Sequence, residues 1–351
     1  MSIIRPFRAI RPKKELASSI AALPYDVYSS AEAREIVRDN PLSFLKIDRA
    51  ETLLPEGTDM YSPQVYEAAR DTLDGMIQNG SFIRDSADCC YIYALTMGGR
   101  TQTGLAACAS IDDYTNGVIL QHEKTLEAKE QDRIRHIDTC SAQTGPIFLT
   151  HRPDAGLHQI TERIKTRDSL YDFTSPDGVR HQVWKIDDPG DIGKIARIYS
   201  GISHLYIADG HHRAASAVKV GLSRRAADPD FSGTEEYNFF LCVLFPSDEL
   251  KIYGYDRVVK DKNGYTFSAF LDKIKDGFEI TRIGAGPYRP EAKGVFGIYS
   301  DGVWYRAQAR PALLSEDPVG GLDVSVLQDH ILAPVLGISD PKTDPRIRFV
   351  G

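Results

Sequence analysis

The chain has 351 residues, of which 42% are apolar and 26% charged, a composition typical of a globular protein and not of a fibrous or disordered one. Single hydrophobic cores stop growing near this length, so we expect two structural units. With 42 Lys and Arg against 49 Asp and Glu, the net charge is −7, which argues against a nucleic-acid partner and requires any phosphate site to be local.

The N-terminal segment and the cysteines predict a cytoplasmic protein with no membrane partner. Arg5, Arg8 and Arg11 interrupt the start of the chain before an apolar signal segment can form, and no later stretch is long enough to span a bilayer. The five cysteines are odd in number and lack C-x-x-C spacing. We therefore expect reduced thiols that are mostly buried.

The first third of the chain alternates helix and strand patterns. Ser29 and Glu32 form a capping box, which predicts that a helix follows. Gly98-Gly99 separates two β-rich runs, as in a hairpin. The expected elements, in chain order, are helices over 31–39 and 63–79 and strands over 90–97 and 101–111.

The remainder continues this mixed pattern. The expected elements are helices over 126–140 and 157–165, a strand over 181–186, a buried strand over 205–208 running into a helix at 214, strands over 237–245 and 251–259, and a hairpin of 295–299 and 303–305. A last helix is expected to be capped by Asp323, to place Val324 on its apolar face, and to end near Leu332 before Pro334.

These patterns predict an α/β fold of the mixed α+β kind. The polar, turn-forming segment 260–264 predicts a boundary between a core, residues 1–259, and a smaller α/β subdomain, residues 260–351. Neither a P-loop nor a G-x-G-x-x-G motif after a strand is present. Any nucleotide would therefore bind through a different motif.

The strongest motif is the junction Ile-Ala-Asp-Gly-His-His-Arg, in which a buried strand turns directly into a helix. Such a helix start offers free N–H groups and the positive end of the helix dipole to an anion. Gly210 lets the anion approach, Arg213 offers a planar fork of donors, and His211 and His212 can donate or transfer protons. The charge of Asp209 suits a cation or a proton better. Alternatively, Asp209 only caps the helix and its neighbours are solvated.

A second motif begins with Gln-His-Glu-Lys-Thr at position 121. Lys129, Arg133 and His136 follow at helical spacing and share one face, which could meet phosphates, while Glu123 could act as a base or metal ligand. A solvated helix balanced by Glu127, Glu130 and Asp132 is the favoured alternative.

A third motif, Leu-Pro-Tyr-Asp-Val at position 23, predicts a polar turn before the first long helix. Tyr25 and Asp26 stand at its centre. A buried tyrosine beside a turn-capping aspartate explains the same pattern.

Six motifs together resemble the family called domain of unknown function 1015: PYDV at 24, NPLSF at 40, HEKT at 122, GPIF at 145, DGHHR at 209 and NFF at 238. The similarity extends from Arg5-Pro-Phe to the end of the chain, and family members generally continue further. DGHHR is also similar to the glycine-arginine box of sulfiredoxin, chromosome-partitioning CTPases and free-serine kinases, which bind nucleotide phosphates at such a helix start. This implies a nucleotide-binding core of that kind.

The resemblance implies an ATP-dependent kinase for a small hydroxyl compound, with free L-serine as the first choice and Mg²⁺ as the metal. The expected roles are phosphate binding by Gly210, His211, Arg213, Lys124 and Arg133, catalysis by Asp209, Glu123 and His212, metal binding through Asp209, and a substrate or structural role for Tyr25 and Asp26.

Two rival functions remain, and the sequence leaves the oligomeric state open, with a homo-oligomer possible. A non-catalytic nucleotide-binding regulator like the partitioning CTPases would normally carry a basic DNA-binding region, against the charge of −7. A sulfiredoxin-like or nucleotide-hydrolysing enzyme is the other; sulfiredoxin chemistry needs a reactive cysteine, and none lies within 209–213.

Overall fold

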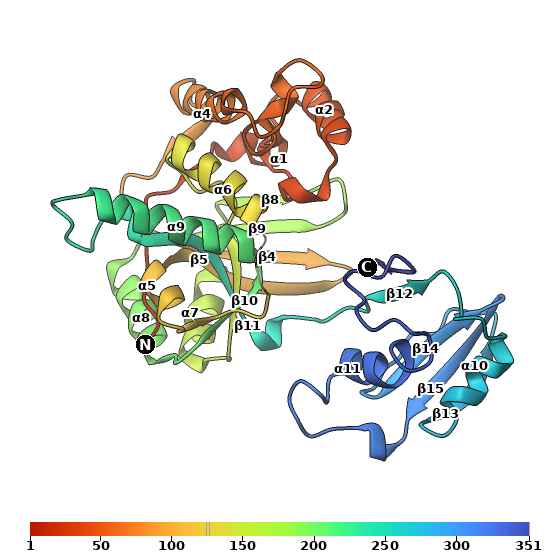
Figure 1. The fold of residues 1–351 in the computed structure, drawn as a ribbon. Coiled ribbons are helices and arrows are strands. Elements are labelled where there is room, and N and C mark those ends of the chain that lie inside the picture. Colours follow the sequence, from red (N-terminus) through yellow and green to blue (C-terminus); the bar gives the residue numbers. More distant parts are fainter. Residues whose placement is uncertain (124, 126, 351) are drawn as a thin grey trace. The chain divides into compact units, whose positions relative to one another are not determined.

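A computed structural model describes residues 1–123, 125 and 127–350 (Figure 1). The chain divides into two compact units, Met1–Lys251 and Ile252–Gly351. This division falls before the expected boundary at 260. Strand β12 (Asp256–Val259) pairs with the last strand, β16 (Ile347–Val350), and so belongs to the second unit.

A large mixed sheet is the frame of the first unit. Its strands are β1 (Ile4–Arg5), β4 (Cys90–Met97), β5 (Arg100–Ser110), β6 (Ile119–Leu120), β7 (Ile147–His151), β8 (Tyr171–Thr174), β9 (Arg180–Ile186), β10 (Leu205–Asp209) and β11 (Phe239–Pro246). Their order is β6-β10-β7-β11-β5-β4-β9-β8, and β1 pairs with the end of β5. β6 with β10 and β7 with β11 are parallel, and the other pairs are antiparallel. The predicted mixed α/β class is therefore confirmed.

Helices pack around this sheet and in an N-terminal group. They are α1 (Ala17–Ile20), α2 (Ser30–Asp39), α3 (Leu45–Asp48), α4 (Pro63–Gln78), α5 (Ile111–Thr115), α6 (Glu127–Cys140), α7 (Ala155–Lys165), α8 (Pro189–Gly201) and α9 (His211–Ala227). α7, α8 and α9 share one hydrophobic core with the sheet. A second core joins α1, α3 and α4 with β3 (Phe82–Arg84), which pairs with β2 (Ile10–Pro12).

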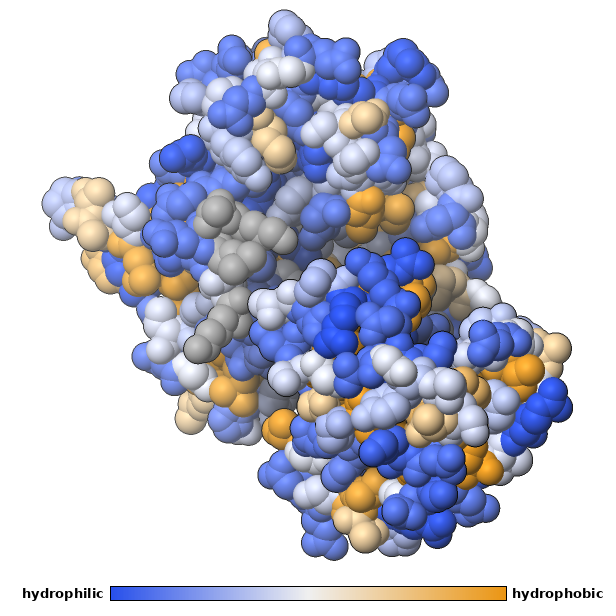
Figure 2. Space-filling model, turned by 45° about the vertical axis from the view of Figure 1, so that its right-hand side comes forward, coloured by the Kyte–Doolittle hydropathy of each residue, from blue (hydrophilic) through white to orange (hydrophobic). Residues whose placement is uncertain are grey.

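Several local predictions are confirmed. Ser29 and Glu32 form the reciprocal capping box of α2. β4 and β5 form the expected hairpin. All five cysteines are free and buried. Among the described residues, no helix is both long and apolar enough to cross a membrane. On the face drawn in Figure 2, hydrophilic residues predominate and apolar ones are scattered among them.

The prediction of a solvated α6 is wrong for Glu130 and Asp132, although Glu127 is exposed as predicted. Its charged residues Glu130, Asp132, Arg133 and His136 are all buried, because α6 packs against both α4 and α9. Glu130 forms an ion pair with Lys219 of α9, and Asp132 accepts a hydrogen bond from Tyr66 of α4. A charged helix pattern can thus belong to a buried helix whose partners come from elsewhere in the chain.

The second unit is built on an antiparallel sheet of order β13-β15-β14, formed by Phe278–Gly284, Val303–Ala309 and Val295–Ser300. Its core also includes α10 (Phe267–Ile274), α11 (Asp323–Leu327) and η7, a π-helical turn over Gln328–Leu332. Of the strand expected over 251–259, only β12 forms.

The last helix ends at Leu332 as expected, but two details of its start differ. Asp323 does not cap it: Leu322 precedes the first turn, and the Asp323 carboxylate accepts a hydrogen bond of 2.8 Å from the backbone N–H of Gly294. Val324 is 47% exposed and so lies outside the apolar face.

Candidate functional site

The junction between β10 and α9 turns at Gly210. Its φ of 90° lies in the left-handed region, which glycine adopts without strain. A Cβ at this position would also come 3.1 Å from the guanidinium carbon of Arg213. In the described part of the chain, no side chain caps α9, so the positive end of its dipole is not occupied by a capping oxygen. The alternative that Asp209 caps this helix is therefore wrong.

Arg213 is fixed across the start of α9. Its Nη2 donates to Oδ2 of Asp209 at 2.5 Å, and its Nη1 donates to the carbonyl oxygen of Pro146 at 2.5 Å. The Arg213 side chain is 17% exposed and that of Asp209 is 69% exposed. The guanidinium is thus pre-positioned beside Gly210, and the carboxylate that holds it faces solvent.

His211 is buried at the start of α9 and lies against the segment before α6. Its Nδ1 lies 3.5 Å from Oε2 of Glu123, and its ring meets that of His122 edge to face at 4.4 Å. Its Nε2 is buried without a hydrogen-bond partner among the described residues. Burial and His122 lower the pKa of His211, and Glu123 and Asp209 only partly oppose this. The phosphate contact expected of His211 stays a prediction.

A pocket of about 130 Å³ lies beside this junction. It is lined by Tyr25, Asp26, Asp48, Arg49, Ala50, Glu51, Met60, Tyr61, Val65, Tyr66, Asp132, Arg133, His136 and His212. These residues come from the turn η2 (Tyr25–Val27), the N-terminal helices, α6 and α9. The pocket is therefore shared by three parts of the chain that are distant in sequence: residues 25–66, residues 132–136 and His212.

Arg133 forms part of the pocket wall. Its Nη2 lies 2.7 Å from Oδ2 of Asp132, and its guanidinium stacks 4.2 Å from the ring centroid of Tyr25. Asp132 also accepts a hydrogen bond of 2.9 Å from Tyr66. Burial raises the pKa of Tyr25, while Arg133 and Arg213 oppose this increase. Arg133 is thus paired and buried, unlike a member of an open cationic stripe.

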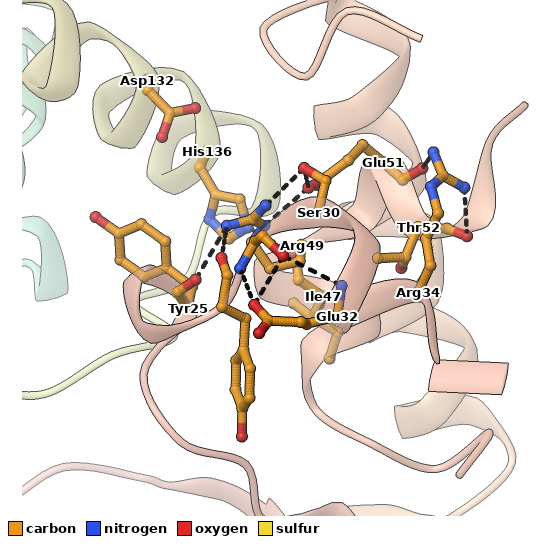
Figure 3. A network of polar contacts seen from close by, with 12 residues as sticks. Tyr25, Ser30, Glu32, Arg34, Ile47, Arg49, Glu51, Thr52, Asp132 and His136 are labelled. Atoms are coloured by element: carbon orange, nitrogen blue, oxygen red, sulfur yellow. Dashed lines mark hydrogen bonds and ion pairs between the residues drawn. The ribbon is translucent and has the colours of Figure 1, made fainter. Parts of the chain in front are cut away.

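His136, a second member of that stripe, is also buried. The Nε2 of His136 lies 3.0 Å from the carbonyl oxygen of Ile47, and burial and Arg133 lower the pKa of this imidazole (Figure 3). The side chain of Lys129 and the whole of Lys124 lie outside the described residues. The proposed phosphate contact by Lys124 therefore stays a prediction.

Arg49 is a structural centre of the pocket that the sequence did not reveal (Figure 3). Its Nη1 donates to the carbonyl oxygens of Tyr25 and Tyr28, at 3.1 and 2.9 Å. Its Nη2 donates to Ser30, and its Nε lies 2.8 Å from Glu51. A buried arginine that binds two carbonyls of one turn fixes the turn's shape. The only local signal is that Arg49 directly follows α3.

The Tyr25 turn therefore does not depend on Asp26. Pro24 precedes η2 without a side-chain cap, and Asp26 is exposed. The alternative of a turn-capping aspartate is wrong, and Asp26 lines the pocket instead.

Mg²⁺ would need further ligands from a bound nucleotide at this site. Among the described residues, no group of three or more His, Cys, Asp or Glu side chains is placed to hold a metal ion. The carboxylates of Asp209 and Glu123 are 69% and 53% exposed, and both act to raise the pKa of His211. One or two exposed carboxylates fit Mg²⁺ that arrives with nucleotide phosphates and keeps several waters.

The fold and the site together define a mixed α/β protein with a glycine-led helix start beside a small polar pocket. A family model described as "Protein of unknown function (DUF1015)" matches residues 4–325, and the chain belongs to this family, as its motifs predicted. No curated protein and no solved structure matches the chain. The similarity of residues 209–213 to the boxes of sulfiredoxin, partitioning CTPases and free-serine kinases stays a prediction.

Proposed function

We propose that this protein transfers the γ-phosphoryl group of ATP to a small hydroxyl compound, with free L-serine as the first acceptor to test. The observation that supports this is the meeting of three motifs at the start of α9. Glu123 lies beside His211, Arg133 stacks on Tyr25, and His212 lines the same pocket. Phosphoryl transfer depends on positioning and charge neutralisation, which such a meeting of groups can supply.

The size of the pocket suggests which substrate lies where. Pockets that hold drug-sized ligands measure roughly 300–1,000 Å³. At about 130 Å³, the pocket beside Tyr25 has room for a small amino acid and not for a nucleotide. The phosphates of ATP would instead lie on the uncapped start of α9, beside Gly210 and Arg213.

The ion pair between Asp209 and Arg213 gives each residue a role. A phosphate that binds Arg213 competes with Asp209 for the same guanidinium. Once displaced, the Asp209 carboxylate can orient the acceptor hydroxyl and accept its proton. Mg²⁺, bound with the nucleotide and held by Asp209 or Glu123, would neutralise phosphate charge.

The cysteines weigh against sulfiredoxin-like chemistry, which needs a reactive thiolate. All five are buried, and burial raises the pKa of Cys140 to about 11 and that of Cys90 to about 12. The pKa values of Cys89, Cys108 and Cys242 are raised for the same reason. Thiols of this kind stay protonated and unreactive at neutral pH.

The test is to incubate the full chain with ATP, Mg²⁺ and a pool of amino acids and to search for a phosphomonoester by ³¹P NMR and mass spectrometry. Arg213→Ala should abolish the product. Arg224→Ala is a matched control, because Arg224 is also an arginine of α9 paired with an aspartate, Asp138. Tight ATP binding without a product from any acceptor would reject the kinase and favour the regulatory protein.

A further inference from the structure

The second unit carries a groove on one face of its sheet. α10 packs on the other face, where Phe267 contacts Tyr305 with ring centroids 5.0 Å apart. Side chains alternate along a strand, so Trp304 and Arg306 project to the face opposite Tyr305. In the β14–β15 register, Arg306 stands across from Gly297. The connection between β13 and β14 borders this face.

The groove has a volume of about 610 Å³. It is lined by Pro287, Tyr288, Arg289, Glu291, Ala292, Val295 and Arg306. This volume lies within the range of roughly 300–1,000 Å³ that is typical of small-molecule sites. The groove therefore has room for a ligand several times larger than the Tyr25 pocket can hold.

Aromatic rings gather beside Gly297. A Cβ at this position would approach Tyr288 and Trp304 to 3.3 Å each, so both rings pack on the bare backbone of β14. The φ of Gly297 is not in the left-handed region, so the close approach of these rings is the reason for glycine here. Tyr299 extends the group, with its ring centroid 5.1 Å from that of Trp304. Such a cluster offers flat apolar faces at the edge of the groove.

Two guanidinium groups line the same groove without a carboxylate partner among the described residues. Arg306 donates only to the side-chain oxygen of Gln308. Arg289 is exposed and takes part in no described hydrogen bond or ion pair. Glu291 is the single acidic residue of the lining. Planar guanidinium groups that have no carboxylate partner are the donors best suited to phosphate.

We propose that this groove binds a mononucleotide, with the base on the aromatic group beside Gly297 and the phosphate between Arg289 and Arg306. A flat ring joined to an anion matches both features, whereas a polyanion is disfavoured by the net charge of −7. This site lies wholly within the second unit. It is independent of the proposed phosphoryl transfer and would make the protein responsive to a nucleotide that it does not consume.

Trp304 allows a direct test, because the only other tryptophan, Trp184, is buried in the first unit. In a Trp184→Phe background, AMP should change Trp304 fluorescence saturably. Arg289→Ala and Arg306→Ala should each raise Kd about tenfold, the loss of one charge-assisted contact. Arg282→Ala is the matched control, since Arg282 stands opposite Tyr305 on the α10 side of the sheet.

The outcomes separate this site from the one at α9. Arg213→Ala should leave the Trp304 signal unchanged, whether or not the protein proves to be a kinase. The absence of a saturable signal at millimolar AMP would overturn the proposal, as would equal Kd values for the parent protein and the two arginine variants. Adenosine or inorganic phosphate binding as tightly as AMP would also overturn it, because adenosine lacks the phosphate and inorganic phosphate lacks the base.

Discussion

The substitution Asp209→Asn separates catalysis from stability. Asp209 is 69% exposed, and its main contact is the ion pair with Arg213. Exposed ion pairs contribute about 0–1 kcal/mol, so the free energy of unfolding should fall by less than about 1 kcal/mol. Loss of a general base typically lowers turnover by about 10²–10⁴-fold. The variant should thus stay folded while its kinase turnover falls at least a hundredfold.

A matched control is the ion pair between Asp138 of α6 and Arg224 of α9. Asp138 is 62% exposed and lies 2.9 Å from Arg224, so Asp138→Asn removes a comparable ion pair away from the start of α9. Both variants should show similar urea midpoints, and only Asp209→Asn should lose phosphomonoester formation, followed by ³¹P NMR at saturating ATP.

The reasoning has a clear point of failure. If Asp209→Asn turned over as fast as Asp138→Asn, the Asp209 carboxylate would not handle the acceptor proton. If instead both variants lost turnover together with stability, the loss would reflect folding and not chemistry. The first result would remove Asp209 from the proposed mechanism, and the second would contradict the expected cost of less than about 1 kcal/mol.

Three further predictions concern stability, measured by urea unfolding. Asp85→Ala should lower the free energy of unfolding by about 3 kcal/mol, because it leaves Arg11 and Lys185 without their carboxylate partner at a buried position. A loss of less than about 1 kcal/mol would contradict this. Burial lowers the pKa of His151 below its usual 6.5, so the unfolded state binds the proton more readily. Stability should fall as the pH drops below about 6.5, less steeply in His151→Gln, and an unchanged slope would argue against this residue. Gly221→Ala should cost about 1–3 kcal/mol, because its Cβ would overlap a backbone carbonyl of the turn after α9, whereas Gly193→Ala, with open space, should be neutral or stabilising.

Local features could be predicted from the sequence because their causes are local. The capping box of Ser29 and Glu32 needs only residues three apart, and the turn at Gly210 depends on a strand, a glycine and a helix that follow one another. The same holds for the β4–β5 hairpin. These elements were therefore predicted correctly without any knowledge of the tertiary structure.

Long-range pairing explains what was missed. The charges of α6 looked solvated because their partners are far away in sequence: Tyr66 for Asp132, and Lys219 for Glu130. Arg49 could not be recognised as the centre of the Tyr25 turn, since nothing in the sequence aims it at those carbonyls. Burial of His211 likewise depends on the segment before α6. Side-chain environments, and with them the roles of these groups, are properties of the assembled fold.

The position of β5 in the sheet has a consequence for synthesis of the chain. β5 pairs with β4 and, at its end, with β1 from the start of the chain, and on its other side with β11, which begins at Phe239. At about 5–20 residues per second, translation from Ser110 to Phe239 takes on the order of ten seconds. Throughout that interval the edge of β5 that will pair with β11 lacks its strand, and an unpaired edge is open to other nascent chains. The ribosome completes the first unit only as it begins the second, so premature termination within α9 would release a chain prone to aggregation.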